Sequence, residues 1–204
     1  MKVALIDYGA GNLRSVANAL RELGVEPVIV SGPEALSGCT HLILPGVGSF
    51  GDCMAQLEQR GLVPAIRQWV AAGKPYLGIC LGYQILFDSS EETPGVRGLG
   101  LVPGAVRRFK EAPGLKIPHM GWNSVVPRKP ETGNWAGLGP EPYFYYVHSY
   151  FPVPDDAAVI AAQTSYGEDN FAAAIELPNL FACQFHPEKS QDAGLRLIRN
   201  FLGL

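Results

Sequence analysis

The sequence predicts an α/β fold in which a mostly parallel central sheet is flanked by helices and extended by antiparallel strands. Strand-like and helix-like segments alternate as far as Ser90, and short β-like runs dominate afterwards. Because successive parallel strands are joined by helical crossovers, the alternation indicates a parallel sheet in the first half. The later β-like runs, which are followed by one helix, indicate the antiparallel extension.

Four runs in the first half are typical of buried strands: 2–7, 25–30, 41–46 and 75–80. Apolar residues recur at helical spacing after three of them, at 13–23, 53–73 and 81–88. The first of these helices should end at Gly24, and the second is expected to be interrupted around Gly61 and Pro64.

The second half contains five further β-like runs, at 101–109, 143–151, 158–164, 171–177 and 180–185. An amphipathic helix is predicted at 191–201. Neither a repeat, nor a low-complexity tract, nor a linker interrupts the sequence. We therefore expect one domain over residues 1–204.

The charge of the sequence argues against two classes of partner. The formal net charge is −3, and Lys and Arg form no run. This argues against nucleic acid and against an anionic membrane surface as partners. No apolar stretch approaches the roughly 18 residues of a membrane span, and the first residues resemble a strand, not a signal peptide. A cytoplasmic location is expected.

Charged residues make up only 17% of the sequence, compared with roughly 25% in an average globular protein. One explanation is a compact domain with a modest surface. The other is a surface partly covered by a partner, because interface cores are depleted in charge. Composition leaves both open.

The four cysteines are Cys39, Cys53, Cys80 and Cys183. Their spacing fits neither CxxC pairs nor the framework of a small secreted disulfide protein. Together with the four histidines they form no cluster at zinc spacing. We expect free thiols, no metal and no cofactor.

Cys80 lies in the pentapeptide Gly78-Ile79-Cys80-Leu81-Gly82, which follows a predicted strand and precedes a predicted helix. This is the pattern of a nucleophile elbow, a strained turn whose flanking residues must be small. A thiol there would lie at a helix N-terminus, where the dipole favours the thiolate. The alternative is a free cysteine that only ends a buried strand.

A nucleophilic cysteine needs a base, often oriented by a third group. His186 follows the apolar run 180–185, and Pro187 should turn the chain so that Glu188 reaches the same imidazole. A histidine after a strand is commonly structural. A cysteine elbow elsewhere in the chain favours the catalytic reading, because triads join distant segments.

A glycine-rich loop, "LPGVGSFG" at 44–51, follows the third predicted strand. Such a loop can direct backbone N–H groups at a developing oxyanion. A plain turn and a phosphate loop are alternatives, although the Lys-Ser/Thr of a Walker A loop is missing. Dinucleotide binding at 7–15 is disfavoured because Arg14 occupies the third glycine position.

The elbow "GICLGYQ" and the distant "FHPE" resemble the class I, triad-type glutamine amidotransferases, which release ammonia from glutamine. Within this family the chain is most similar to the glutaminase subunits of imidazole glycerol phosphate synthase, from histidine biosynthesis. The motifs are "LIDYGAGNL", "PGVGSFGD", "GLGLVPG", "PHMGWN", "YYVHSY" and "QFHPEKS". Tyr83, where methionine is expected, and Tyr146, where phenylalanine is more frequent, depart conservatively.

The resemblance implies a flavodoxin-like class I amidotransferase fold and a role for each site residue. Cys80 would attack the carboxamide carbon of L-glutamine and form a glutamyl thioester, His186 would move the protons, and Glu188 would orient His186. An oxyanion would be held by the N–H of Leu81 and by the loop residues Gly46, Val47 and Gly48. Contacts with the substrate glutamine are expected at Gln84, His148 and Ser149. His148 is not expected to act as a second base.

The resemblance also implies a partner, a cyclase subunit with a (β/α)₈ barrel that receives ammonia without its entering solvent. Residues expected at this interface are Asn12, His119, Trp122, Asn123 and Lys189. Trp122 is expected there because exposed aromatics in turns are common binding anchors. A buried position in the core is the alternative for this side chain.

Three other functions remain as alternatives. The glutaminase of another ammonia-using synthase, such as the one that makes pyridoxal phosphate, is disfavoured by "PHMGWN". A cysteine hydrolase or chaperone-like protein with a flavodoxin-like core would not be expected to carry "FHPE". A binding module without activity is disfavoured because the cysteine, histidine and glutamate are all present.

Overall fold

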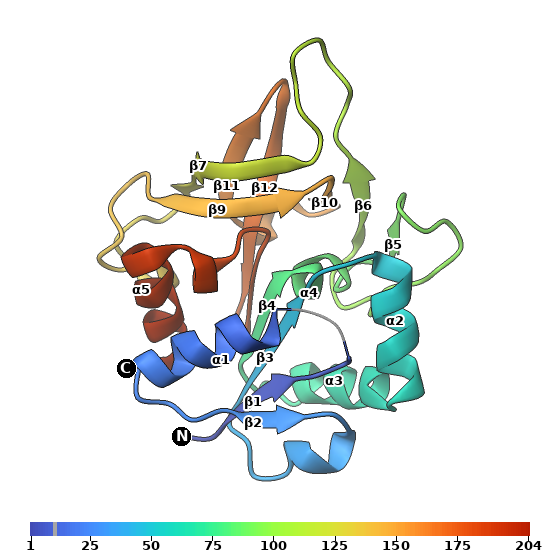
Figure 1. Cartoon of the computed structure of the whole chain (residues 1–204), viewed down its shortest axis with the longest axis vertical. Coiled ribbons are helices and arrows are strands. Elements are labelled where there is room, and N and C mark those ends of the chain that lie inside the picture. The colour runs from blue at the N-terminus through green and yellow to red at the C-terminus, as the bar shows by residue number, and fades with distance from the viewer. Residues whose placement is uncertain (10–11) are drawn as a thin grey trace.

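The computed structural model describes residues 1–9 and 12–204 (Figure 1). Its largest sheet has the strand order β2-β1-β3-β4-β13-β12-β11-β8. These strands are β1 (Val3–Ile6), β2 (Val28–Val30), β3 (His41–Gly46), β4 (Tyr76–Cys80), β8 (Val126–Pro127), β11 (Ile160–Tyr166), β12 (Asp169–Leu177) and β13 (Leu180–Cys183). The strands from β2 to β13 in this order are parallel, and β12, β11 and β8 continue the sheet in antiparallel pairings.

Helices cover both faces of the parallel block. They are α1 (Leu13–Glu22), α2 (Phe50–Gln59), α3 (Leu62–Ala71), the single-turn α4 (Leu81–Gln84) and α5 (Gln191–Leu202). Apolar side chains of α2, α3 and α4 pack on one face, and those of α1 and α5 pack on the other. Successive strand residues alternate between the two cores, as Ala4 and Leu5 do in β1.

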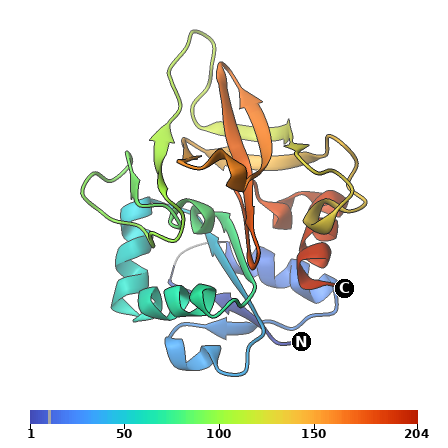
Figure 2. The same cartoon turned by 180° about the vertical axis from the view of Figure 1, so that it is seen from behind.

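Two smaller sheets lie above the carboxyl ends of the parallel strands (Figures 1 and 2). One has the order β10-β6-β5, and the other pairs β7 with β9. Their bounds are β5 (Ser89–Ser90), β6 (Gly104–Arg108), β7 (His119–Ser124), β9 (Tyr143–His148) and β10 (Tyr150–Pro154). Short 3₁₀ turns are η1 (Pro33–Leu36), η2 (Gly133–Trp135), η3 (Ala157–Val159) and η4 (Pro187–Lys189).

The predicted fold class is confirmed, with differences in three places. Gly61 separates α2 from α3 in a left-handed conformation, but Pro64 lies inside the first turn of α3, where the lack of an N–H does no harm. The helix after Cys80 ends at Gln84, one turn after it begins. The second half also contributes a parallel strand, because β13 pairs in parallel with β4.

The pairing of β13 with β4 is what positions the site. Cys183 lies opposite Ile79, so the residues that follow each strand meet at the same edge of the sheet. All four cysteines are free and buried. None of the helices within residues 1–9 and 12–204 has the length and apolar character needed to cross a membrane.

Candidate active site

Cys80 is the last residue of β4 and precedes the first residue of α4. Its backbone has φ 54° and ψ −105°, a conformation that a non-glycine residue adopts only under strain. The side chain is 94% buried, since 6% of the residue is exposed. This is the sharp strand-to-helix turn expected of a nucleophile elbow.

Close backbone contacts explain the glycines on either side of Cys80. A Cβ on Gly82 would lie 1.9 Å from the Leu44 carbonyl oxygen, and one on Gly78 would lie 2.5 Å from the Gly82 carbonyl oxygen. Both distances are far below van der Waals contact, and backbone atoms have little freedom to retreat. The turn therefore requires glycine at both positions.

The imidazole of His186 is held in a fixed orientation. Its Nδ1 donates a hydrogen bond of 2.8 Å to Glu188 Oε1, and both side chains are fully buried. The Ser190 hydroxyl donates to the His186 carbonyl oxygen at 2.6 Å and accepts from the Tyr145 N–H at 3.0 Å. Because Nδ1 is occupied by Glu188, Nε2 is the nitrogen left to exchange protons at the thiol.

The protonation of His186 depends on its two neighbours. Burial by itself lowers the pKa of His186, but the negative charge of Cys80 and that of Glu188, with the hydrogen bond to Glu188, outweigh burial and raise the pKa to about 10. The imidazolium is therefore the stable form of His186 when Cys80 carries a negative charge. A histidine held in this way is suited to activate a cysteine nucleophile.

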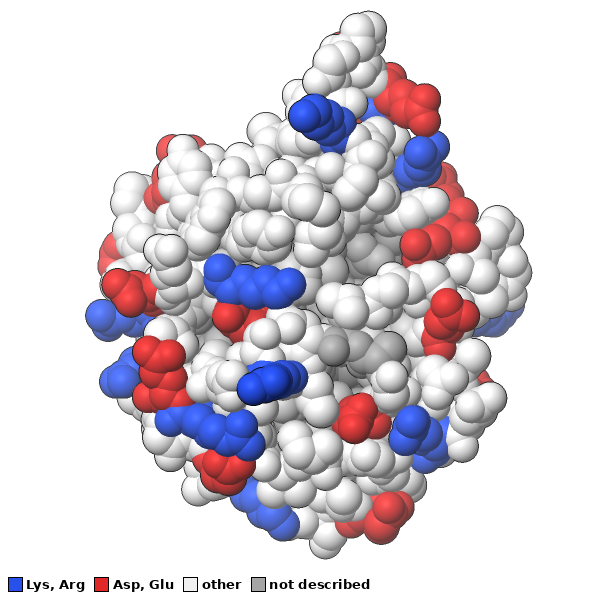
Figure 3. All heavy atoms as spheres, viewed as in Figure 1, with Lys and Arg blue, Asp and Glu red and all other residues white. Residues whose placement is uncertain are grey.

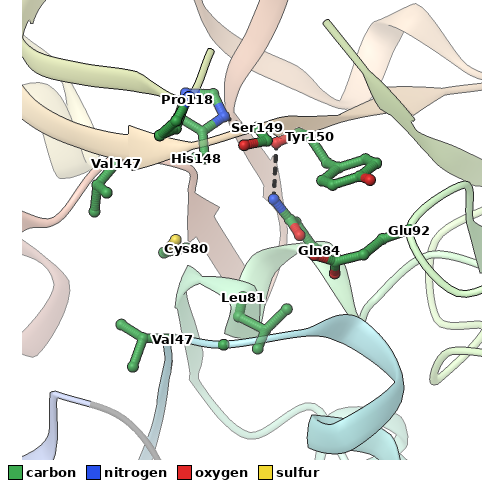
Figure 4. A pocket seen from close by; sticks show the side chains of 11 residues that line it. Val47, Cys80, Leu81, Gln84, Glu92, Pro118, Val147, His148, Ser149 and Tyr150 are labelled. Carbon is green, nitrogen blue, oxygen red and sulfur yellow. Dashed lines mark hydrogen bonds between the residues drawn. The ribbon is translucent and has the colours of Figure 1, made fainter.

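A cavity of about 330 Å³ opens at Cys80. Figure 4 shows the thiol between Val47 and Leu81 on one side and His148 and Ser149 on the other. Of the residues predicted to bind substrate or oxyanion, the cavity wall contains Val47, Gly48, Leu81, Gln84, His148 and Ser149. Gly46 lies behind this wall at the end of β3, where a Cβ would approach Leu81 Cβ to 2.7 Å.

Gln84 is tied to two other residues by its amide nitrogen. Nε2 donates to the Tyr150 carbonyl oxygen at 2.9 Å and to Gln184 Oε1 at 3.0 Å. The side chain is buried at the cavity wall. Its Oε1 is consequently the atom available to a ligand.

His148 belongs to a buried chain of hydrogen bonds. Its Nδ1 donates to the Tyr150 carbonyl oxygen at 2.8 Å, so its Nε2 accepts from His119 Nδ1 at 3.0 Å. His119 Nε2 in turn accepts from Asn123 Nδ2 at 3.2 Å. Burial lowers the pKa of His148 to about 3 and that of His119 to about 4. Both rings are neutral at physiological pH, which supports setting His148 aside as a base.

Side-chain alternation along β7 corrects part of the expected interface. The segment is a strand and not an exposed turn. His119, which was expected at the interface, is only 3% exposed, so its side chain does not form part of the surface. Asn123 faces the same way and donates to His119 and to the Ser165 carbonyl oxygen. The Trp122 side chain points to the opposite side of the strand and is 48% exposed. Met120 points to the same side as Trp122 and is 61% exposed.

The other two predicted interface residues lie next to the site. Asn12 Nδ2 donates a hydrogen bond of 2.7 Å to Glu188 Oε1, the same oxygen that accepts from His186. Lys189 follows Glu188, and its Nζ lies 5.7 Å from the centre of the Tyr145 ring. Asn12 therefore contacts the triad itself, a role that the sequence did not suggest.

A comparison with family models matches residues 4–203 to the glutamine amidotransferase class I family. The chain belongs to this family. Curated relatives of the amidotransferase are the imidazole glycerol phosphate synthase subunit HisH of Thermosynechococcus vestitus, 49% identical over 99% of the chain and 96% of the relative, and HisH of Methanothermobacter thermautotrophicus, 48% identical over 98% and 97%.

Solved structures agree with this assignment. A glutamine amidotransferase with 25% identity covers the whole chain and 98% of that structure, with a TM-score of 0.75. PurLQS from Thermotoga maritima shares the fold, with 22% identity, a TM-score of 0.78 and coverage of 99% and 97%. The predicted family, the enzyme class and the function of a glutaminase subunit of imidazole glycerol phosphate synthase are confirmed by these relatives.

Sequence reasoning missed three residues of this amidotransferase. Glu92 lines the cavity and accepts a 2.7 Å hydrogen bond from the Phe50 N–H, although it lies in a loop without any recognisable motif. Gln184 contacts the sulfur of Cys80, and its place before "FHPE" was the only available signal. Met120 could be recognised as exposed only once the alternation of side chains along β7 was known.

Within the described ranges, no group of three His, Cys, Asp or Glu side chains is arranged to hold a metal ion.

The buried histidine pair should make the amidotransferase acid-sensitive. Between pH 6.5 and about 4 the unfolded chain protonates His119 and His148 while the folded chain does not, so stability falls as pH falls through this window. Each histidine contributes a slope of up to about 1.4 kcal/mol per pH unit. His186 contributes little there, because its raised pKa keeps it protonated in both states.

Urea unfolding between about pH 5 and 6.5 tests this expectation for one histidine. The His119→Gln variant should show a shallower dependence of unfolding free energy on pH than the parent protein. Equal slopes in the two proteins would contradict the assignment of a neutral, buried His119.

Proposed function

We propose that Cys80, His186 and Glu188 carry out the glutamine hydrolysis of this subunit, and that the ammonia passes to a cyclase subunit with a (β/α)₈ barrel. The observation that carries the proposal is the elbow cysteine at the floor of a cavity, beside an imidazole held by a buried glutamate. Relatives named as synthase subunits support the existence of a partner.

The reaction proceeds in two halves. The Cys80 thiolate attacks the carboxamide carbon, a C–S bond forms, and the His186 imidazolium gives its proton to the amide nitrogen as the C–N bond breaks and ammonia leaves. Water then attacks the glutamyl thioester while neutral His186 accepts its proton. The C–S bond breaks, glutamate is released, and the thiolate–imidazolium pair is restored.

Backbone donors for the oxyanion are available next to the sulfur. Leu81 opens α4, so its N–H has no partner within the helix and lies at the elbow. Val47 and Gly48 form the facing wall of the cavity, and Gly48 has φ +101°, a backbone conformation that glycine adopts readily. Losing one such donor typically costs about 10²–10³ in rate.

Glu92 supplies the only carboxylate among the residues that line the cavity in the described part of the chain. Glutamine carries an α-ammonium group, and a carboxylate at the far side of the cavity is a complementary partner for it. Gln84 Oε1, on the same wall, is a second acceptor. We infer that these two side chains hold the amino end of the substrate.

Replacing Glu92 by glutamine should raise KM for glutamine by about 10- to 100-fold, because a charge-assisted hydrogen bond becomes a neutral one. The Gln side chain keeps an oxygen for the Phe50 N–H, so the helix start is preserved. Steady-state kinetics of glutamate release would measure the change. An unchanged KM would place the ammonium elsewhere.

The candidate docking surface is the outer face of β7 and β9, which we call the β7/β9 face. It consists of Met120, Trp122, Tyr143, Tyr145 and Val147, which the strand register places side by side. Figure 3 shows that few charged side chains interrupt this region. Val147 also lines the cavity, so the face and the site are continuous. A partner seated here could receive ammonia without its passing through solvent.

The Trp122→Ala variant should bind the cyclase at least about tenfold more weakly, because an exposed aromatic at the centre of an apolar face is a typical binding anchor. Calorimetry with the purified cyclase measures the affinity. Ile29→Ala is a matched control, since Ile29 is also exposed but lies on β2, an edge strand of the large sheet to which β7 and β9 do not belong. Equal affinity of parent and Trp122→Ala proteins would exclude Trp122 from the interface.

The partner itself is tested by mixing the chain with the cyclase and its ribonucleotide ligand. Glutamate release should rise well above that of the isolated chain. If the mixture gives no stimulation, the cyclase partnership is contradicted while the glutaminase chemistry stands. A cytoplasmic location stays a prediction.

A further inference from the structure

We propose that Gln184 is a catalytic residue whose side-chain amide donates a hydrogen bond to the Cys80 sulfur and stabilises the thiolate. This rests on the proposed role of Cys80 as nucleophile. Gln184 Nε2 lies 3.6 Å from Cys80 Sγ, within the range of a hydrogen bond to sulfur, and Gln184 is completely buried.

The sheet register brings these two residues together. β13 and β4 are parallel, and Cys183 lies opposite Ile79. The next residue on each strand is Gln184 and Cys80, so they leave neighbouring strands at the same level. The Gln184 main chain is anchored on the other side by its N–H, which donates to the Ala173 carbonyl oxygen at 2.8 Å.

A hydrogen-bond network determines which end of the Gln184 amide faces the sulfur. Gln84 Nε2 donates to the Tyr150 carbonyl oxygen, which can only accept, so the amide nitrogen of Gln84 is located. The same nitrogen donates to Gln184 Oε1 at 3.0 Å. The opposite end of the Gln184 amide, its NH₂ group, must then face Cys80.

An amide donor in a buried site favours the charged form of the sulfur. A thiolate accepts hydrogen bonds much more strongly than a thiol, and the low local dielectric increases the difference. His186 loses and regains its proton during the reaction, whereas an amide stays a donor throughout. Gln184 can therefore stabilise the thiolate again when it is expelled from the thioester.

The same network connects the sulfur to the substrate wall. Gln84 lines the cavity, and its amide nitrogen donates to the side-chain oxygen of Gln184. A glutamine molecule bound against Gln84 would therefore contact the residue that positions the Gln184 amide at Cys80. The ionisable groups that face Cys80 or its cavity from neighbouring elements are His186, Glu188, Cys183, Tyr8, His148, Tyr150 and Glu92. Replacing Gln184 alters none of them, so a changed pH profile would report the amide.

The test is the rate at which iodoacetamide alkylates Cys80, followed across pH by mass spectrometry of the Cys80 peptide in the intact chain. In the Gln184→Met variant, which keeps side-chain length but has no donor, alkylation at neutral pH should fall about tenfold or more, and its midpoint should move to higher pH by about one unit. Thr164→Val is the matched control, because Thr164 is buried and hydrogen-bonded but lies outside the cavity wall.

Gln184→Glu provides a second variant if Gln184→Met does not fold. Its carboxylate still accepts from Gln84 but places negative charge at the sulfur, so alkylation should fall further. A parent-like profile in a folded variant, even with lower thermal stability, would show that Gln184 only fills the core and would overturn the inference. If Cys80 of the parent protein already alkylates like an ordinary exposed thiol, the proposed nucleophile fails first, whatever the variants show.

Discussion

Glutamate release from glutamine is expected to fall by at least about 10⁴-fold when Cys80 is replaced by alanine. Among the described residues that line the cavity, Cys80 supplies the only thiol. Cys183 is buried in the core, where burial raises the pKa of its thiol well above the usual range. His186 would remain as a base for direct attack by water, but without the thioester route that reaction is slow.

The matched control for this substitution is Cys39→Ala. Cys39 is also a free, buried cysteine, but it packs in the core beneath η1, away from the cavity. Its variant should keep the parent rate of glutamate release, measured with a coupled glutamate assay. Substantial residual activity in a folded Cys80→Ala protein would refute the thioester mechanism.

Gly82→Ala is expected to destabilise the fold by about 3 kcal/mol or more, because the added methyl group would overlap backbone atoms. The added Cβ would lie 1.9 Å from the Leu44 carbonyl oxygen and 2.8 Å from Leu44 Cδ2. Relief requires α4 to move away from β3, which would also displace the elbow. Urea unfolding would measure the loss.

Gly32→Ala is the control for that experiment. The three atoms nearest to the new Cβ would be carboxylate atoms of Glu34, at the end of a flexible side chain, and the backbone of Gly32 is extended, so any residue can adopt it. A change within about 1 kcal/mol is expected there. Similar stability of the Gly82→Ala and parent proteins would mean that the close approach of α4 to β3 is not required.

Local pattern was sufficient to predict the parallel half of the sheet and its helices. The strands up to Cys80 are short continuous apolar runs, and the helices between them repeat apolar residues with a period of about 3.6. The Gly-x-Cys-x-Gly spacing likewise predicted a tight turn, because only small residues permit the backbone contact now seen at Gly82. These features depend on residues that lie close together in the sequence.

What the sequence could not predict depends on contacts between distant segments. The parallel pairing of β13 with β4, which sets Gln184 beside Cys80, is invisible in either strand alone. His119 was expected at the partner interface, because the segment contains too few apolar residues to reveal which of its side chains are buried. Glu92 reaches the cavity from an irregular loop, where no periodicity exists to indicate direction.

The central claim is that glutamine is cleaved through a glutamyl thioester on Cys80. Acid quenching of the parent protein during turnover, followed by mass spectrometry of its peptides, tests this most directly. The triad geometry predicts a glutamyl adduct on the Cys80 peptide that accumulates more in a Glu188→Gln variant, in which His186 is a weaker base for thioester hydrolysis. Continued glutamate release without any adduct on Cys80, or with the adduct on another residue, would contradict the account.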